Sequence, residues 1–128
     1  MNITWVPGRP LELCTSRFIL RSLSKSDVND NYVSWWNDAQ LQAGFNQKPR
    51  GWRLQHAYQH VSRFDNRNNF HLGIFKKETM DLIGFYTIFL NLKSGVATTN
   101  VLVGNKDYWG ANVTKEVSRV VFDYIFNV

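Results

Sequence analysis

Three consecutive segments between residues 70 and 103 have the pattern of β-strands joined by short turns, and this run constrains the fold most. The segments are Phe70–Lys76, Leu82–Asn91 and Val96–Val103. The connections Glu78–Asp81 and Lys93–Gly95 are short, and short connections join strands that run antiparallel to each other. The sequence therefore predicts an antiparallel sheet in the second half of the chain.

A strand and a helix are predicted near the start of the chain. Arg17–Leu23 is rich in large apolar residues that alternate weakly with polar ones, as in a strand. Ser24, Ser26 and Asp27 follow as candidate N-caps, because their short polar side chains accept hydrogen bonds from free backbone N–H groups. We expect the helix to run to about Trp36.

Two more helices are predicted from the spacing of apolar residues. A loop at Gln47–Gly51 precedes Trp52–Phe64, where apolar residues recur every three or four positions, and Val113–Val128 repeats this spacing. The order strand, helix, helix, three strands, helix predicts an α+β fold with a mainly antiparallel sheet.

Composition predicts one compact domain and excludes several classes of protein. The 128 residues are 44% hydrophobic and 15% aromatic, typical of a single globular domain. Cys14 is the single cysteine, so an intramolecular disulfide is excluded, no thiolate metal site is expected, and a cytoplasmic protein is favoured. The longest apolar passage, Leu82–Leu90, is much shorter than the about 20 residues that cross a membrane, so we expect no membrane-spanning segment.

The net charge of +5 favours an anionic ligand or partner. Nucleic acid, an acidic protein and a polyphosphate cofactor all fit a charge of this sign. Basic residues are scattered from Arg9 to Arg119 without forming a stripe, so we do not expect a nucleic-acid partner.

The junction VLVGNKDYWGANVTKE joins the last predicted strand to the last helix through a loop that contains glycine. Such a junction offers backbone N–H groups and the positive end of a helix dipole, which together attract phosphate. It contains neither the Lys and Ser/Thr of a P-loop nor the three glycines of a dinucleotide fingerprint. His56 and His60 lie one helical turn apart elsewhere, and we expect a solvated or capping pair there and no metal site.

Three segments resemble the GNAT superfamily of acyl-CoA-dependent N-acyltransferases: SRFILRSLSKSDVNDNYVSWWND, LIGFYTIF and VLVGNKDYWGANVTKEVSRVVFDYIF. The branch that they resemble most is that of the ribosomal-protein N-terminal acetyltransferases, with related amino-sugar acetyltransferases. The resemblance runs from about Leu11 to Val128. It implies a three-layer GNAT-like fold, with a mainly antiparallel mixed sheet and helices on both faces.

The resemblance also implies acetyl-CoA as acyl donor, bound at a loop that this branch writes W-G-x-G-x-A/G-x-E. Trp109, Gly110 and Glu116 agree with this pattern, whereas Asn112 replaces a glycine and Thr114 replaces a glycine or alanine. Asparagine tolerates a left-handed backbone, and the threonine hydroxyl can donate to a phosphate. The residues expected to bind acetyl-CoA are Val101, Leu102, Val103, Trp109, Gly110, Ala111, Asn112, Val113 and Thr114.

The reaction implied is attack of a primary amine on the acetyl thioester. The acceptor could be a protein N-terminus, an amino sugar or another small amine. Candidates for handling the amine proton are Asp38, His71 or a water held by Asn100. Trp35, Trp36 and Tyr86 are the expected acceptor-binding residues, and the tryptophan pair is also expected to pack in the core.

Domains of this superfamily continue with a fifth strand, a fourth helix and two closing strands. The resemblance thus implies that the 128 residues are one incomplete domain, through truncation, through loss of activity, or because another copy supplies the missing wall. The last strand would then be an exposed edge, and we expect a homo-oligomer formed through it. The alternative function is a truncated or degenerate GNAT-fold binding module without catalytic activity.

Overall fold

The computed structural model describes residues 8–44, 48–91 and 93–126. Its contacts divide the chain into two compact units, Met1–Ser22 with Asp65–Val128, and Leu23–Phe64. Gln47, the predicted start of a loop, and Val128, the predicted end of the last helix, lie outside the described residues.

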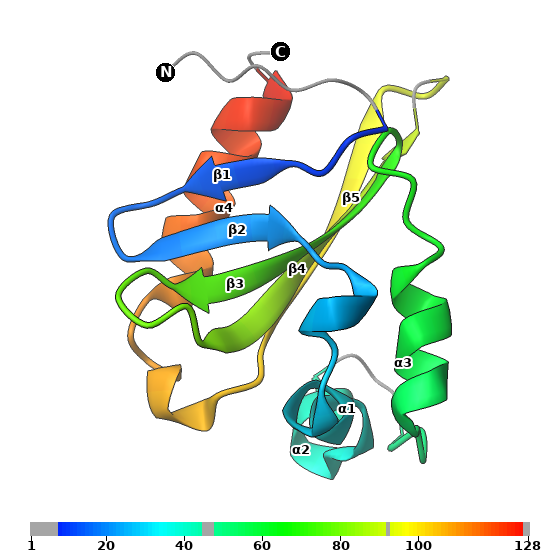
Figure 1. The fold of residues 1–128 in the computed structure, drawn as a ribbon. Helices are drawn as coiled ribbons and strands as arrows, with labels where there is room; N and C mark the ends of the chain where they lie inside the picture. The colour runs from blue at the N-terminus through cyan, green and yellow to red at the C-terminus, as the bar shows by residue number, and fades with distance from the viewer. Residues whose placement is uncertain (1–7, 45–47, 92, 127–128) are drawn as a thin grey trace. The chain divides into compact units, whose positions relative to one another are not determined.

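The first unit contains a five-stranded antiparallel sheet (Figure 1). Its strands are β1 (Glu12–Cys14), β2 (Phe18–Ser22), β3 (Asn69–Lys76), β4 (Leu82–Asn91) and β5 (Val96–Val103), and they lie in chain order across the sheet. Each neighbouring pair is antiparallel. The predicted antiparallel sheet and its two short hairpins are therefore confirmed.

Strand β1 was not predicted, because three residues are too few to show an alternating pattern. Its central residue, Leu13, is buried opposite Leu20 of β2, while Glu12 and Cys14 are exposed. The position of β1 depends on this pairing with β2, and no local sequence pattern predicts the pairing.

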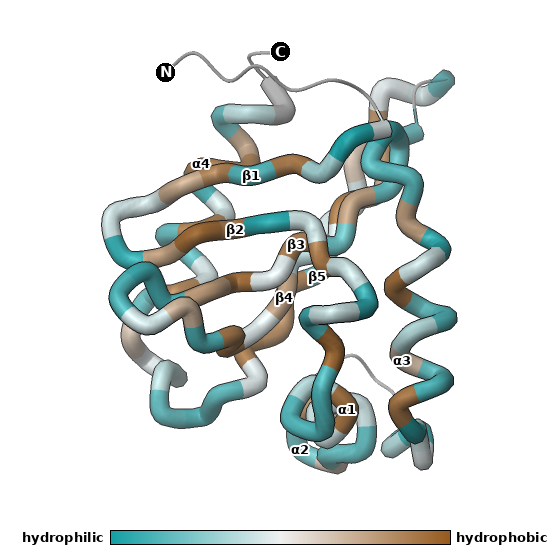
Figure 2. The backbone as a smooth tube through the Cα atoms, viewed as in Figure 1, coloured by the Kyte–Doolittle hydropathy of each residue, from teal (hydrophilic) through white to brown (hydrophobic). Residues whose placement is uncertain are grey.

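Helix α4 (Val113–Phe126) lies across one face of the sheet and closes the hydrophobic core (Figure 1). Val113, Val117 and Val121 are spaced by four residues, so they share one helix face, and all three are buried. They join a core that includes Leu13, Leu20, Phe70, Leu72, Ile74 and Ile88. In Figure 2 apolar residues run along β2 and β3, whereas the β3–β4 hairpin is hydrophilic.

The second unit contains α1 (Asp30–Asn37), α2 (Ala39–Ala43) and α3 (Leu54–Val61), preceded by a short 3₁₀ turn, η1 (Lys25–Asp27). The first helix therefore begins later than predicted. Its N-cap is Asn29, whose side chain accepts a hydrogen bond from the Tyr32 N–H at 2.9 Å. Ser24 and Asp27, which were predicted to cap this helix, instead form the N-terminal cap of η1. There the Ser24 N–H donates to the Asp27 carboxylate.

Helix α2 is a further element that was not predicted. Its N-cap is Asp38, and its five residues are too few to show the helical spacing of apolar side chains. Helix α3 is shorter than the predicted Trp52–Phe64. In the described part of the chain, no helix is both long and apolar enough to cross a membrane.

Within the first unit, the residues that flank the second unit in the sequence are hydrogen-bonded to each other. The Ser22 hydroxyl at the end of β2 donates to the Asn66 side-chain oxygen at 2.7 Å and accepts from the Leu11 N–H at 2.8 Å. Residues 23–64 thus form the connection between two paired strands, β2 and β3.

Strand β5 is an edge of the sheet, since its one hydrogen-bonded neighbour among the described strands is β4. The predicted exposed edge is therefore present in the described residues. Self-association through that edge stays a prediction.

Gly84 of β4 lies opposite Val103, where the β5 backbone approaches very closely. An added Cβ would lie 2.2 Å from the Leu102 carbonyl oxygen, so Gly84→Ala forces the two strands apart. We expect a loss of about 3 kcal/mol in the free energy of unfolding, measured by urea denaturation. Gly95→Ala is the matched control: a Cβ there has open space, and its φ of +71° limits the loss to about 1 kcal/mol. Equal losses in the two variants would contradict the steric explanation.

Candidate functional site

The loop between β5 and α4 has two residues in the left-handed region. After the 3₁₀ turn η2 (Lys106–Tyr108), Gly110 has a φ of +81° and Asn112 a φ of +60°. Asn112 therefore adopts the backbone conformation that the expected glycine favours. The departure of this position from the family pattern does not prevent a left-handed turn just before the helix.

The first turn of α4 presents unpaired backbone donors. The Glu116 N–H donates to the Asn112 carbonyl at 3.1 Å. The N–H groups of Val113, Thr114 and Lys115 come before this bond, and such groups have no partner within the helix. Thr114 and Lys115 are exposed, so the hydroxyl and the ammonium group lie on the surface at the positive end of the helix dipole. This end of α4 is suited to an anion.

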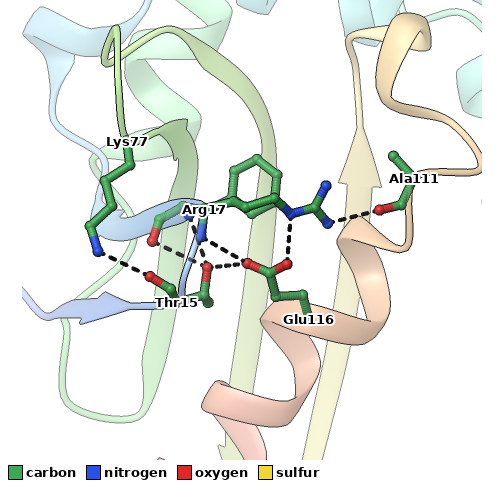
Figure 3. Close-up of polar contacts among 6 residues, drawn as sticks. Thr15, Arg17, Lys77, Ala111 and Glu116 are labelled. Carbon is green, nitrogen blue, oxygen red and sulfur yellow. Dashed lines mark hydrogen bonds and ion pairs between the residues drawn. The ribbon is translucent and has the colours of Figure 1, made fainter.

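A cluster of hydrogen bonds attaches this loop to the β1–β2 turn (Figure 3). The Glu116 carboxylate accepts hydrogen bonds from the Thr15 hydroxyl, from the Arg17 backbone N–H at 3.1 Å and from Arg17 Nε at 2.8 Å. The same guanidinium donates to the Ala111 carbonyl at 2.8 Å. We call Thr15, Arg17, Ala111 and Glu116 the Arg17 clamp. The clamp fixes the start of α4 and the residue before Asn112 to the first hairpin.

The Arg17 clamp also sets the charge of Glu116. Burial by itself would raise the pKa of this carboxyl, but the hydrogen bonds from Thr15 and Arg17 and the positive charge of Arg17 outweigh it and lower the pKa. Glu116 is therefore ionised at neutral pH, and its charge is balanced by Arg17 at 2.8 Å. An ionised carboxylate in the first turn thus does not leave the helix end negatively charged.

The end of β5 contacts the loop through Trp109. The indole N–H donates to the Val103 carbonyl at 2.8 Å, and the Lys106 ammonium group lies 5.9 Å from the Trp109 ring centre. The structure therefore brings Val101–Val103 and Trp109–Thr114, the residues expected to bind acetyl-CoA, to one end of the edge strand.

Three polar residues lie in a row across the sheet. The register pairs His71 of β3 with Thr87 of β4, and Thr87 with Asn100 of β5. Directly paired residues place their side chains on the same face, and His71 Nδ1 lies 2.9 Å from Thr87 Oγ1. His71 and Thr87 are buried, whereas Asn100 is exposed. This polar row leads from a buried imidazole to the edge strand.

Tyr86 has its contacts on the side of the sheet that α4 covers. Its ring is 1% exposed, and its hydroxyl donates to Ser118 of α4 at 3.2 Å. Successive residues of a strand point to opposite faces, so Tyr86 faces away from the side chain of Thr87. This placement gives Tyr86 a role in the core.

The other expected residues belong to the Leu23–Phe64 unit. The Asp38 carboxylate caps α2 by accepting from the Gln40 and Leu41 N–H groups at 2.9 and 3.1 Å. Trp35 and Trp36 are buried, and Trp36 stacks on Trp52 with ring centres 4.5 Å apart. The expected core packing of the tryptophan pair is confirmed.

The histidine pair differs in part from its prediction. His56 is a capping residue, as expected, because its Nδ1 accepts from the Arg53 N–H at 2.9 Å. His60 is half-buried among aromatic rings: its ring lies 5.1 Å from Trp36 and 5.3 Å from Phe64, centre to centre. Burial, aided by Arg63 and Arg50, lowers the pKa of His60 to about 4.

Sequence reasoning missed Thr15, Arg17 and Thr87. Glu116 belongs to the quoted loop pattern, and a carboxylate there could have prompted a search for a cation. Arg17 lies 99 residues earlier in the chain, however, so no local pattern joins the two. Thr87 is a candidate site residue only because the sheet register pairs it with His71 and Asn100.

Comparison with known proteins identifies a family and a similar solved structure. A family model described as an acetyltransferase (GNAT) domain matches residues 17–128. Among solved structures, the fold is similar to the crystal structure of an acetyltransferase (GNAT family) from Bacillus anthracis, with a TM-score of 0.74 and 12% sequence identity. That match covers 91% of this chain and 67% of the other. No curated protein matches the sequence at a significant level.

The lowered pKa of Glu116 predicts a pH-dependent contribution to stability. A carboxyl whose pKa is lower in the folded state stabilises the fold above its unfolded pKa, about 4.3, and loses this effect as pH falls through the folded pKa. We expect Glu116→Gln to cost about 1 kcal/mol at pH 7 and progressively less below about pH 4.3, measured by urea denaturation at several pH values. Glu12→Gln, which makes the same substitution at an exposed carboxylate of β1, is the control, with a small difference expected at pH 7. A Glu116→Gln difference that does not change with pH would contradict the ionised clamp.

Proposed function

The chain belongs to the GNAT acetyltransferase family, and we propose that it transfers an acetyl group from acetyl-CoA to a primary amine. The observation that carries this proposal is the junction of β5 and α4. An edge strand, a left-handed turn and a helix end with unpaired donors lie together there, held by the Arg17 clamp.

The donor set at the junction fits the phosphates of acetyl-CoA. The N–H groups of Val113, Thr114 and Lys115 and the Thr114 hydroxyl are hydrogen-bond donors at a positive helix end, and phosphates need such donors. The carboxylate nearest to them, Glu116, is balanced by Arg17. We propose that these groups hold the pyrophosphate, and that the β5 edge at Val101–Val103 holds the pantetheine.

Acetyl-CoA supplies the acetyl group as a reactive thioester, while residues of this chain handle the amine proton. Asn100 is exposed on β5 and is suited to orient the amine or a water beside it. Its neighbour Thr87 has a Cβ about 5 Å away across the strand pair, which leaves room for one bridging water.

Thr87 and His71 can then carry the proton inward. In the tautomer with a proton on Nε2, His71 Nδ1 accepts a hydrogen bond from the Thr87 hydroxyl. The hydroxyl accepts a proton from the water or amine while it passes its own proton to Nδ1. His71 would thus act as general base through Thr87, without contacting the amine.

The acceptor is proposed at the level of its chemistry, a primary amine. The quoted segments resemble the ribosomal-protein N-terminal acetyltransferase branch, so a peptide with a free N-terminus is the first acceptor to assay. An amino sugar and a small polyamine complete the panel.

Binding of acetyl-CoA is tested by calorimetry with variants of the loop. Thr114→Glu places a negative charge among the proposed phosphate donors, so we expect affinity to fall about tenfold or more. Ser94→Glu makes the same addition of charge in the β4–β5 turn and should leave affinity unchanged. Asn112→Gly should change affinity less than about threefold, because Asn112 already has a positive φ. Absence of binding at millimolar acetyl-CoA would reject the proposed function in favour of a binding module without activity.

The role of the polar row is tested with Thr87→Val, which removes the hydroxyl and keeps the shape of the side chain. We expect kcat for acetylation to fall about tenfold to 100-fold, with KM for acetyl-CoA unchanged, because proton transfer is affected and cofactor binding is not. Thr99→Val, on the neighbouring position of β5 opposite Ile88, is the control. An unchanged kcat in Thr87→Val would exclude the relay.

A further inference from the structure

A pocket of about 250 Å³ lies beside the Arg17 clamp. It is lined by Ser16 and Arg17 from the β1–β2 turn, Phe18 from the start of β2, Lys76 from the end of β3, Lys77 and Glu78 from the β3–β4 turn, and Tyr108 from η2. None of these residues belongs to the set proposed to bind acetyl-CoA. The pocket is therefore lined by residues other than those proposed to bind acetyl-CoA, and Tyr108 lies in the same β5–α4 connection as the loop.

The lining combines positive charge with aromatic surface. Lys76 and Lys77 carry two positive charges, against the one negative charge of Glu78, and the charge of Arg17 is balanced by Glu116. Phe18 and Tyr108 meet edge to face with ring centres 6.2 Å apart. The Tyr108 hydroxyl beside Lys76 raises the pKa of that ammonium group, so Lys76 is charged at neutral pH.

We propose that this pocket binds a small organic anion, with a phosphate or carboxylate group on an apolar body about the size of one ring. The cations supply charge-assisted hydrogen bonds to the anionic group, and the ring of Tyr108, which is partly exposed whereas that of Phe18 is buried, supplies apolar contact for the body. The volume is below the range of about 300–1,000 Å³ typical of sites for drug-sized ligands, so the ligand is correspondingly small.

The pocket shares Arg17 with the loop that precedes α4. Arg17 Nε bonds Glu116, and the same guanidinium bonds the Ala111 carbonyl, so an anion that attracts Arg17 weakens its hold on both. We therefore expect an anion in the pocket to lower the affinity of the protein for acetyl-CoA without preventing its binding. This expectation rests on the proposed function. Coupling of this kind is reciprocal between the two ligands.

The experiment is calorimetric titration of the protein with phenyl phosphate, with inorganic phosphate and benzyl alcohol as comparison ligands. We expect phenyl phosphate to bind more tightly than either, because it alone has both the charge and the ring. Lys76→Gln combined with Lys77→Gln should weaken its binding about tenfold or more, since charge-assisted hydrogen bonds are lost. The matched control combines Lys25→Gln with Lys93→Gln, which removes the same charge from exposed lysines outside the pocket. Thermal melting checks that both double variants fold.

Three outcomes would overturn the proposal: no binding of phenyl phosphate at about 20 mM, equal weakening in the two double variants, or binding of inorganic phosphate as tight as that of phenyl phosphate. A repeat at saturating acetyl-CoA tests the separation of the sites. A limited, saturable loss of phenyl phosphate affinity supports two coupled sites, and complete displacement rejects a separate pocket. If acetyl-CoA does not bind, the proposed function fails, while the titration of phenyl phosphate alone still decides whether the pocket binds organic anions.

Discussion

The described site depends on the hydrogen bonds and the ion pair that the Glu116 carboxylate makes. The carboxylate accepts hydrogen bonds from three groups of the β1–β2 turn. The Arg17 guanidinium, which donates one of them, also donates a hydrogen bond to the Ala111 carbonyl. A carboxylate near a helix N-terminus is stabilised by the helix dipole, and here a guanidinium compensates it as well. Glu116 thus orders the loop before α4, and Arg17 offsets its charge, so that helix end stays suited to an anion.

The sheet register creates a second functional relationship. His71, Thr87 and Asn100 are polar residues on three adjacent strands, and only the pairing of β3, β4 and β5 makes them neighbours. A buried imidazole without a partner would be costly, and the Thr87 hydroxyl at 2.9 Å provides one. The same hydrogen bond that satisfies His71 in the core provides the route that we propose for the amine proton.

The sequence predicted those features that depend on local periodicity. The three strands after residue 70, their turns, and the stripe of Val113, Val117 and Val121 were all correctly placed, because alternation and helical spacing persist over many residues there. The two short elements β1 and α2 were missed, since three and five residues cannot establish a period. Arg17 was missed as a site residue because its partners lie 94 and 99 positions away. The left-handed backbone at Asn112 was anticipated from the chemistry of asparagine, and the hydrogen bonds that hold it in place were not.

The bond between Ser22 and Asn66 has a consequence for how this chain tolerates change in length. It joins two residues 44 positions apart, at the point where β2 leaves the sheet and β3 returns to it. The entropy of closing a flexible loop rises only logarithmically, about 0.6 kcal/mol for each doubling of length. Changes of length in the loops between these two residues therefore add little to the entropy of closing the strand pair. The register of His71, Thr87 and Asn100 is set by the pairing of β3, β4 and β5 and does not depend on the length of those loops.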